Sequence, residues 1–68
     1  MRSVLKVNGS EIEYTETMEL CELLEFLELS NQICAVEVNQ TLVPHHERSQ
    51  YKLNEGDAIE IVKLVGGG

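Results

Sequence analysis

The 68-residue sequence is poor in basic residues. Five lysines and arginines stand against twelve aspartates and glutamates, which gives a formal net charge of −7 at pH 7. A surface this acidic repels phosphate backbones and anionic lipid headgroups, so nucleic acid and membranes are poor candidates for partners. The charge favours a partner with a basic face, because opposite charges steer association. Solubility alone is an equally good explanation of the charge.

Cysteine is also scarce, and its spacing excludes two further classes. Cys21 and Cys34 form neither a CxxC pair nor a zinc-type spacing, and two cysteines are too few for a disulfide scaffold. No apolar run approaches the roughly 18 residues of a membrane-spanning helix, and no signal-peptide pattern is present. We therefore expect a cytoplasmic protein with both thiols reduced.

The sequence lacks a recognisable catalytic constellation as well. A chain of this length forms one small domain with little room for a supported cleft. His45 and His46 are adjacent, so their rings diverge, and an exposed loop pair is a better interpretation than a metal site. Cys21 is interpreted as a half-buried small hydrophobe and Cys34 as a core residue. We predict no bound cofactor or metal and a module that is acted upon, not an enzyme.

The elements that are present begin with a hairpin and a helix. Residues 3–7 and 10–14 alternate as strands around Asn8-Gly9, a dipeptide typical of the type I′ turn. Residues 18–28 predict a helix with Thr17 as its N-cap and no capping box. Its apolar stripe has the i, i+3, i+4, i+7 spacing and consists of Leu20, Leu23, Leu24 and Leu27.

The second half predicts more strands. Residues 33–39 alternate, Asn39-Gln40 forms a turn, and residues 41–43 are a very short strand that Pro44 ends. Residues 45–52 are expected to be polar and irregular, with Leu53 as an isolated apolar anchor, and residues 58–65 form the last strand. The order ββαβββ predicts an α+β fold, a sheet with a single helix on one face.

The last strand is apolar on both faces in its C-terminal half, whereas one helix covers only one face of a sheet. We therefore expect an exposed apolar patch for partner binding near Val62 and Leu64, with Leu42 and Val43 as neighbours. The alternative is that these side chains pack at the sheet edge under the 45–52 loop.

The strand leads directly into Gly66-Gly67-Gly68, whose final residue has the α-carboxylate. Without Cβ atoms, the three residues form a thin thread that reaches at most about 10 Å, long enough to present the carboxylate inside a partner's cleft. A frayed end or a cloning scar explains the glycines alone equally well. A carboxylate in this position can be adenylated by ATP and then attacked by a nucleophile.

Several short segments together resemble the ThiS-type sulfur carriers of thiamin biosynthesis, which are ubiquitin-like β-grasp proteins. The segments are Glu37-Val38-Asn39, Val43-Pro44, Glu55-Gly56-Asp57, Ile59-Glu60-Ile61-Val62 and Gly67-Gly68. The resemblance spans the whole chain, and it departs from the family at His45, where an arginine commonly follows Val-Pro. It implies a mixed sheet of about five strands with one main helix, a β-grasp domain over residues 1–65, and a flexible tail over residues 66–68.

The resemblance also implies a function. A ThiF-type adenylyltransferase would use Mg-ATP to activate the Gly68 carboxylate, with Gly67 as the required neighbour and Gly66 as spacing. A cysteine desulfurase system would supply sulfur as a persulfide, and the resulting thiocarboxylate would give its sulfur to a ThiG-type thiazole synthase. Two alternatives remain: a related carrier for another pathway such as molybdopterin synthesis, and a β-grasp interaction module whose glycines are incidental.

Overall fold

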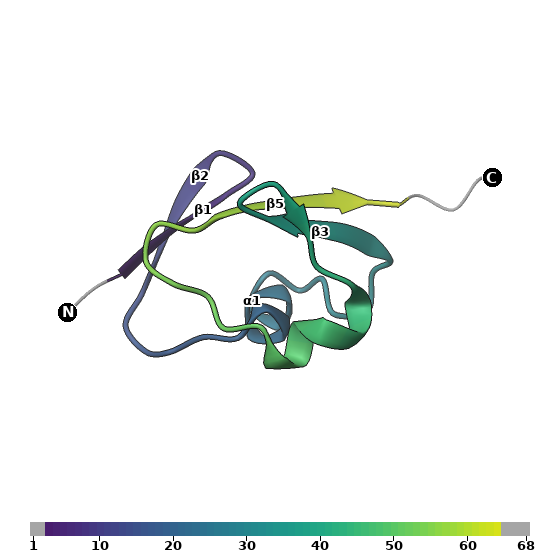
Figure 1. Cartoon of the computed structure of the whole chain (residues 1–68), viewed down its shortest axis with the longest axis horizontal. Coiled ribbons are helices and arrows are strands. Elements are labelled where there is room, and N and C mark those ends of the chain that lie inside the picture. Colours follow the sequence, from purple (N-terminus) through teal and green to yellow (C-terminus); the bar gives the residue numbers. More distant parts are fainter. Residues whose placement is uncertain (1–2, 65–68) are drawn as a thin grey trace.

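The computed structural model describes residues 3–64, which form five strands, one α-helix and one 3₁₀-helix. The elements in chain order are β1 (Ser3–Val7), β2 (Ser10–Tyr14), α1 (Leu20–Phe26), β3 (Cys34–Val38), β4 (Thr41–Leu42), the 3₁₀-helix η1 (His45–Gln50) and β5 (Ala58–Lys63). The α+β prediction, with one main helix on one face of the sheet, is confirmed (Figure 1). Within residues 3–64, no helix is long and apolar enough to cross a membrane.

The strands form one mixed sheet in the order β2-β1-β5-β3-β4. β5 is the central strand, parallel to β1 and antiparallel to β3, while β1–β2 and β3–β4 are antiparallel hairpins. A parallel pair needs a long crossover connection, and the segment that contains α1, β3, β4 and η1 supplies it. The strand that precedes the glycines therefore has a hydrogen-bonded neighbour on each side.

Two-residue turns close both hairpins. Asn8 and Gly9 have φ values of 50° and 87°, as the predicted type I′ turn requires. Asn39 and Gln40, also predicted as a turn, have φ values of 52° and 69°. The paired registers Val7↔Ser10 and Val38↔Thr41 leave only these two residues in each loop. Tight loops of this kind fix the strand register, and hence which side chains face α1.

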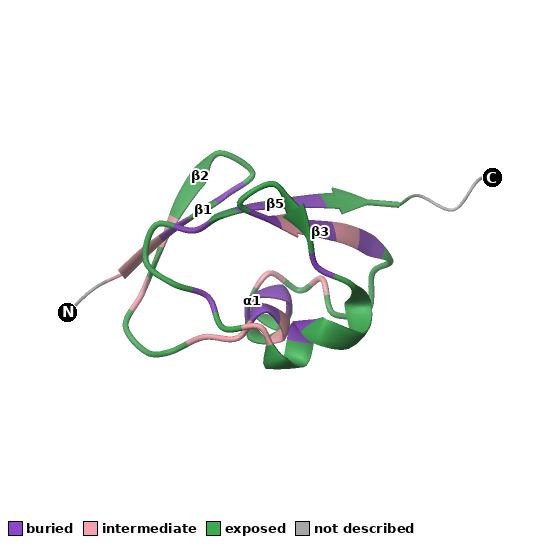
Figure 2. Cartoon of the chain, in the orientation of Figure 1, coloured by how far each residue is buried: buried purple, intermediate pink, exposed green. Residues whose placement is uncertain are grey.

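The core lies between α1 and one face of β1, β3 and β5 (Figure 2). The predicted helical stripe is buried at its first three positions and half-buried at Leu27. The alternation predicted for β3 is confirmed, and Leu53 is buried as the predicted anchor. The buried apolar residues are Leu5, Val7, Leu20, Leu23, Leu24, Cys34, Val36, Val38, Val43, Leu53, Ile59 and Ile61.

The N-terminus of α1 differs from the prediction. Glu19, not Thr17, is the N-cap, and the Glu22 carboxylate accepts a hydrogen bond from the Glu19 N–H at 2.8 Å. The Leu20 N–H donates to the carbonyl of Tyr51 at 2.8 Å, so a distant segment satisfies a donor that a local cap would otherwise serve. The prediction of Thr17 as the N-cap was wrong because the Tyr51 contact is not local in sequence. The Glu19–Glu22 capping box is local, and the sequence analysis missed it.

The C-terminus of α1 comes before the predicted residue 28. Glu28 has a φ of 61°, and its N–H donates to the backbone carbonyl of Glu25. The Leu29 N–H donates to the backbone carbonyl of Leu24 at 2.7 Å. These two bonds define a Schellman motif, whose left-handed position is usually glycine. A glutamate at this position is strained, and it ends the helix because left-handed backbone cannot continue it.

The substitution Glu28→Gly is expected to stabilise the protein by about 0.5–1 kcal/mol. The left-handed conformation costs a residue with a Cβ about 1–2 kcal/mol, and the extra entropy of glycine in the unfolded chain offsets part of the gain. Thermal unfolding measures the effect. The matched control is Glu25→Gly within the helix, which should cost about 1 kcal/mol. A lower melting temperature for Glu28→Gly would contradict the strain argument.

The remaining differences lie in the second half. The third strand begins at Cys34, one residue later than predicted, and β5 ends at Lys63; the predicted end, Val65, lies outside the described residues. The segment expected to be irregular from residue 45 contains η1, which packs against α1. Arg48 of η1 is buried, which a local pattern of polar residues does not predict.

Candidate functional site: the C-terminal strand and the exposed sheet face

Two asparagine side chains fix β5 from its two neighbours. The Asn8 side chain continues the β1–β5 ladder: its Oδ1 accepts from the Ile61 N–H at 2.8 Å and its Nδ2 donates to the Ile61 carbonyl at 3.2 Å. On the other side, Asn39 Oδ1 accepts from the Ala58 N–H at 3.0 Å. Both asparagines sit in left-handed turn positions, which asparagine tolerates better than most residues. The turns therefore also serve to hold the strand.

Asp57 connects this arrangement to the turn that precedes β5. One carboxylate oxygen accepts from Asn39 Nδ2 at 2.9 Å, and the other accepts from the Asn54 N–H at 2.8 Å. Asp57 is buried, and these bonds compensate for the loss of hydration. The family resemblance depends in part on the segments that contain Asn39, Asp57 and Ile59. These three segments thus meet at the start of β5.

Replacement of Asn39 by alanine is expected to destabilise the fold by about 2–3 kcal/mol. The change removes two hydrogen bonds and leaves one oxygen of the buried Asp57 carboxylate without its donor. Urea unfolding measures the loss. Gln40→Ala is the matched control, because Gln40 has the same left-handed backbone and is exposed; it should change stability by no more than about 0.5 kcal/mol. Equal effects of the two variants would show that backbone strain, not the side-chain bonds, matters.

The ladder continues one residue beyond β5. The Leu64 N–H donates to the Ile33 carbonyl at 2.9 Å, which holds the chain against β3 up to the last described residue. Gly66, Gly67 and Gly68, the predicted reactive tail, lie outside the described residues. The tail follows β5 after two residues, Leu64 and Val65.

The face of the sheet that points away from α1 has an apolar patch. In the β3–β5 register Val62 lies opposite Ala35, and the Leu64–Ile33 bond extends the same register by one pair. Ile33, Leu42, Val62 and Leu64 are 74%, 59%, 57% and 53% exposed. The expected exposure of Val62, Leu64 and Leu42 is confirmed, and packing under the 45–52 loop is excluded, because that segment packs against α1. We call Ile33, Leu42, Val62 and Leu64 the apolar patch.

Val43 is not part of the apolar patch, and its assignment to this surface was wrong. It is only 3% exposed and belongs to the core. Its N–H donates to the Val36 carbonyl at 2.9 Å, and Leu42, the residue before it, lies opposite Glu37 on the outer face. Successive residues in extended backbone point to opposite faces, so Leu42 and Val43 cannot share one.

Ile33 is a patch residue that the sequence analysis missed. Ile33 is two residues before Ala35 and four before Glu37, whose side chains point to the outer face of the sheet. Because side chains alternate along a strand, the same pattern places Ile33 on that face. Among residues 3–64, Phe26 is the remaining large exposed apolar residue outside the apolar patch. It lies on α1, on the opposite side of the sheet from the apolar patch, and therefore belongs to a different surface.

Two negatively charged glutamates face each other beside the apolar patch. Glu37 of β3 and Glu60 of β5 are directly opposite each other in the register, on the outer face. Like charges in this position destabilise a sheet. The β1–β2 pair provides a contrast on the same face, because Lys6 lies opposite Glu11.

The substitution Glu60→Gln should stabilise the isolated protein by about 0.2–1 kcal/mol, because it removes the repulsion from Glu37. The gain should shrink as salt concentration rises, since exposed charges are screened. Thermal unfolding at low and high salt measures both effects. Glu11→Gln is the matched control and should be destabilising, because it removes an attraction to Lys6. Stabilisation by both variants would mean that net charge, not the pair, is responsible.

The remaining side chains that could act as nucleophiles, bases or metal ligands do not form a catalytic site within residues 3–64. Burial raises the pKa of the Cys21 thiol, and the nearby carboxylates of Glu19, Glu25 and Glu22 raise it further, so the thiol is protonated at neutral pH. His45 and His46 are exposed, as predicted. Among the described residues, no group of three or more His, Cys, Asp or Glu side chains could hold a metal ion.

The five-stranded sheet, its single helix and the strand that leads into the glycines define a β-grasp protein with an exposed apolar patch on the outer face of its sheet. The sequence matches the ThiS family over residues 4–68. The chain therefore belongs to the ThiS family of β-grasp sulfur carrier proteins, whose members are carriers, not catalysts.

Individual relatives agree with this assignment. The sulfur carrier protein ThiS of Bacillus subtilis is 33% identical over 66 residues, which cover 96% of this chain and 100% of that protein. A thiazole synthase of Paramagnetospirillum magneticum is 38% identical over 64 residues, 94% of this chain but only 20% of that protein. The crystal structure of ThiS from Geobacter metallireducens superposes with a TM-score of 0.81 at 28% identity, covering 96% of this chain and 99% of that one.

Proposed function

We propose that this protein carries sulfur as a thiocarboxylate on Gly68 and donates it for thiazole formation in thiamin biosynthesis. The observation that carries the proposal is the family match, which runs through residue 68 and so includes the whole glycine tail. The anchored central strand supports it, because a carrier needs a rigid body from which a thin tail extends. We accordingly divide the chain into a β-grasp domain over residues 1–65 and a tail over residues 66–68.

The proposed chemistry takes place in partner enzymes. A carboxylate oxygen of Gly68 attacks the α-phosphorus of Mg-ATP in a ThiF-type adenylyltransferase, and pyrophosphate leaves. The terminal sulfur of a cysteine persulfide, supplied by a cysteine desulfurase system, then attacks the acyl carbon and displaces AMP. A second thiol attacks the resulting disulfide bond; a new disulfide forms and the thiocarboxylate is released. Adenylation is needed because AMP is a far better leaving group than the carboxylate oxygen.

The thiamin branch is favoured over molybdopterin synthesis by one relative. The thiazole synthase of Paramagnetospirillum magneticum contains a segment similar to almost the whole of this chain. A carrier-like segment within the same polypeptide as that enzyme supports a ThiG-type thiazole synthase as the acceptor of the sulfur. We propose that the apolar patch docks on the activating enzyme, because exposed apolar side chains grouped on one face mark interaction surfaces.

Intact-mass spectrometry tests the carrier function. The protein is incubated with Mg-ATP, a ThiF-type enzyme and a persulfide source, and the expected result is a mass gain equal to replacement of one oxygen by one sulfur. The control omits ATP and should show no gain. A protein that binds a competent activating enzyme yet never gains mass would instead be an interaction module. Rescue of a thiazole-requiring strain, compared with rescue of a molybdopterin-deficient one, separates the two pathways.

A further inference from the structure

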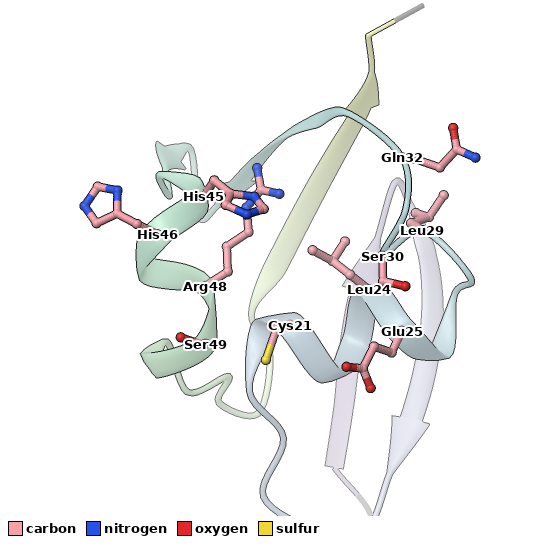
Figure 3. A pocket seen from close by; sticks show the side chains of 10 residues that line it. All are labelled: Cys21, Leu24, Glu25, Leu29, Ser30, Gln32, His45, His46, Arg48 and Ser49. Atoms are coloured by element: carbon pink, nitrogen blue, oxygen red, sulfur yellow. The ribbon is translucent and has the colours of Figure 1, made fainter.

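A pocket of about 290 Å³ lies between α1 and η1, on the side of the molecule opposite the apolar patch. Its walls come from α1, from the loop that follows α1, and from η1 (Figure 3). At roughly 30 Å³ per water molecule in the liquid, the space admits a ligand of several non-hydrogen atoms. The proposed sulfur-carrier chemistry uses none of this surface.

A buried arginine forms one wall of the pocket. Arg48 is only 8% exposed, and its Nη2 donates to the Cys34 carbonyl at 2.8 Å. Its Nη1 has only a weak contact, 3.9 Å from Cys34 Sγ, and its buried Nε–H has no acceptor among residues 3–64. No carboxylate of the described residues is in ion-pair contact with it, although the chain is strongly acidic overall.

A buried guanidinium without an anionic partner is an unusual arrangement, because desolvation of a charge is costly unless the charge is paired. A guanidinium presents its N–H groups in a planar fork that fits the two oxygens of a carboxylate. The other walls supply neutral donors, the side chains of Ser30, Gln32 and Ser49, and an apolar surface from Leu24 and Leu29. Figure 3 shows Leu24 extending from α1 and Arg48 from η1 at this pocket.

We propose that this pocket binds a small carboxylate with a short apolar body. The carboxylate pairs with the guanidinium of Arg48, and the apolar part covers Leu24 and Leu29. Glu25, which also lines the pocket, repels the ligand's charge and so limits its affinity. The site is independent of the tail and of the apolar patch, so its failure would leave the proposed carrier function untouched.

The signal of the Arg48 Nε–H in NMR spectra tests the proposal directly. The sequence contains two arginines, Arg2 and Arg48, so an Arg2→Lys background leaves a single arginine Nε–H signal. Butyrate has the carboxylate and the apolar body, 1-butanol lacks the charge, and inorganic phosphate lacks the apolar body. Sodium chloride serves as the ionic-strength control. The expected result is a saturable shift with butyrate and only weak or linear changes with the other three. A shift with butyrate no larger than with chloride, or equal shifts with butanol or phosphate, would overturn the proposal.

Two pocket variants change the affinity in opposite directions. Arg48→Met keeps an apolar stem but removes the guanidinium and its charge, and saturable butyrate shifts of the pocket amides, such as Ser30 and Ser49, should disappear. Glu25→Gln removes the repulsion and should tighten butyrate binding several-fold. Because Glu25 is exposed, this second variant keeps the test valid even if Arg48→Met does not fold. Unchanged affinity in Glu25→Gln, or persistent saturable binding in a folded Arg48→Met, would place the ligand elsewhere.

Discussion

A chain that lacks Gly68 should give at least about 100-fold less thiocarboxylate than the full-length protein while it unfolds at the same temperature. Removal of one residue withdraws the carboxylate by about 3.5 Å, and a misplacement of about 1 Å can already cost a reaction about 100-fold. The fold should not respond, because the core and the hydrogen-bonded sheet of the described residues lie within residues 3–64. Intact mass and thermal unfolding measure the two quantities.

Gly66→Ala is the matched control for the deletion. It keeps the number of residues and the terminal carboxylate, and it adds a single Cβ at the position that we interpret as spacing. Most of the product should therefore remain. A full yield from the shortened chain would show that the activating enzyme does not measure the length of the tail, and would weaken the assignment of Gly68 as the only productive end.

The second large effect is expected from Val62→Asp, which places a carboxylate in the apolar patch. Loss of a hot-spot residue near the centre of an interface costs about 2 kcal/mol or more, and an unpaired carboxylate there is costly to desolvate, so affinity for the ThiF-type enzyme should fall by about 30-fold or more. The stability of the free protein should change little, because Val62 is largely exposed. Titration calorimetry measures the affinity, and circular dichroism checks the fold.

Phe26→Asp provides the control for the patch. It makes the same kind of change at an exposed apolar side chain, but on α1, on the other side of the sheet. Affinity should not change in this variant. Equal losses in the two variants would mean that added negative charge, not the surface it occupies, weakens binding. Collapse of the fold in Val62→Asp would show that the side chain is needed for packing.

Local patterns predicted much of the fold. The Asn8-Gly9 hairpin, the alternation in β3 and the apolar stripe of α1 each depend on residues close in sequence, and each is confirmed. The start of α1 was mispredicted because the Tyr51 carbonyl, more than thirty residues away, satisfies the Leu20 N–H. A contact of this kind has no signature in a short window of sequence.

The apolar patch was predictable in part for a related reason. The exposure of Val62 and Leu64 followed from the lack of a second helix. The exposure of Ile33 and the burial of Val43 depended instead on which face of the sheet each side chain points to in the two neighbouring strands. A shift of one residue in facing exchanges core and surface, so small errors of register have large consequences. The burial of Arg48 is a tertiary effect, because α1 and β3 cover a segment that is polar in sequence.

The central position of β5 also decides how the protein bears load. A partner that grips the tail and pulls applies force along the strand axis. The ladder bonds cross that axis: they are perpendicular to it in the antiparallel β3–β5 pair and slanted in the parallel β1–β5 pair. The bonds from β5 to β1 and β3, with those of the Asn8 and Asn39 side chains, are then loaded together in shear, instead of being opened one at a time. The fold is thereby built to resist mechanical extraction from the end at which its partners would handle it.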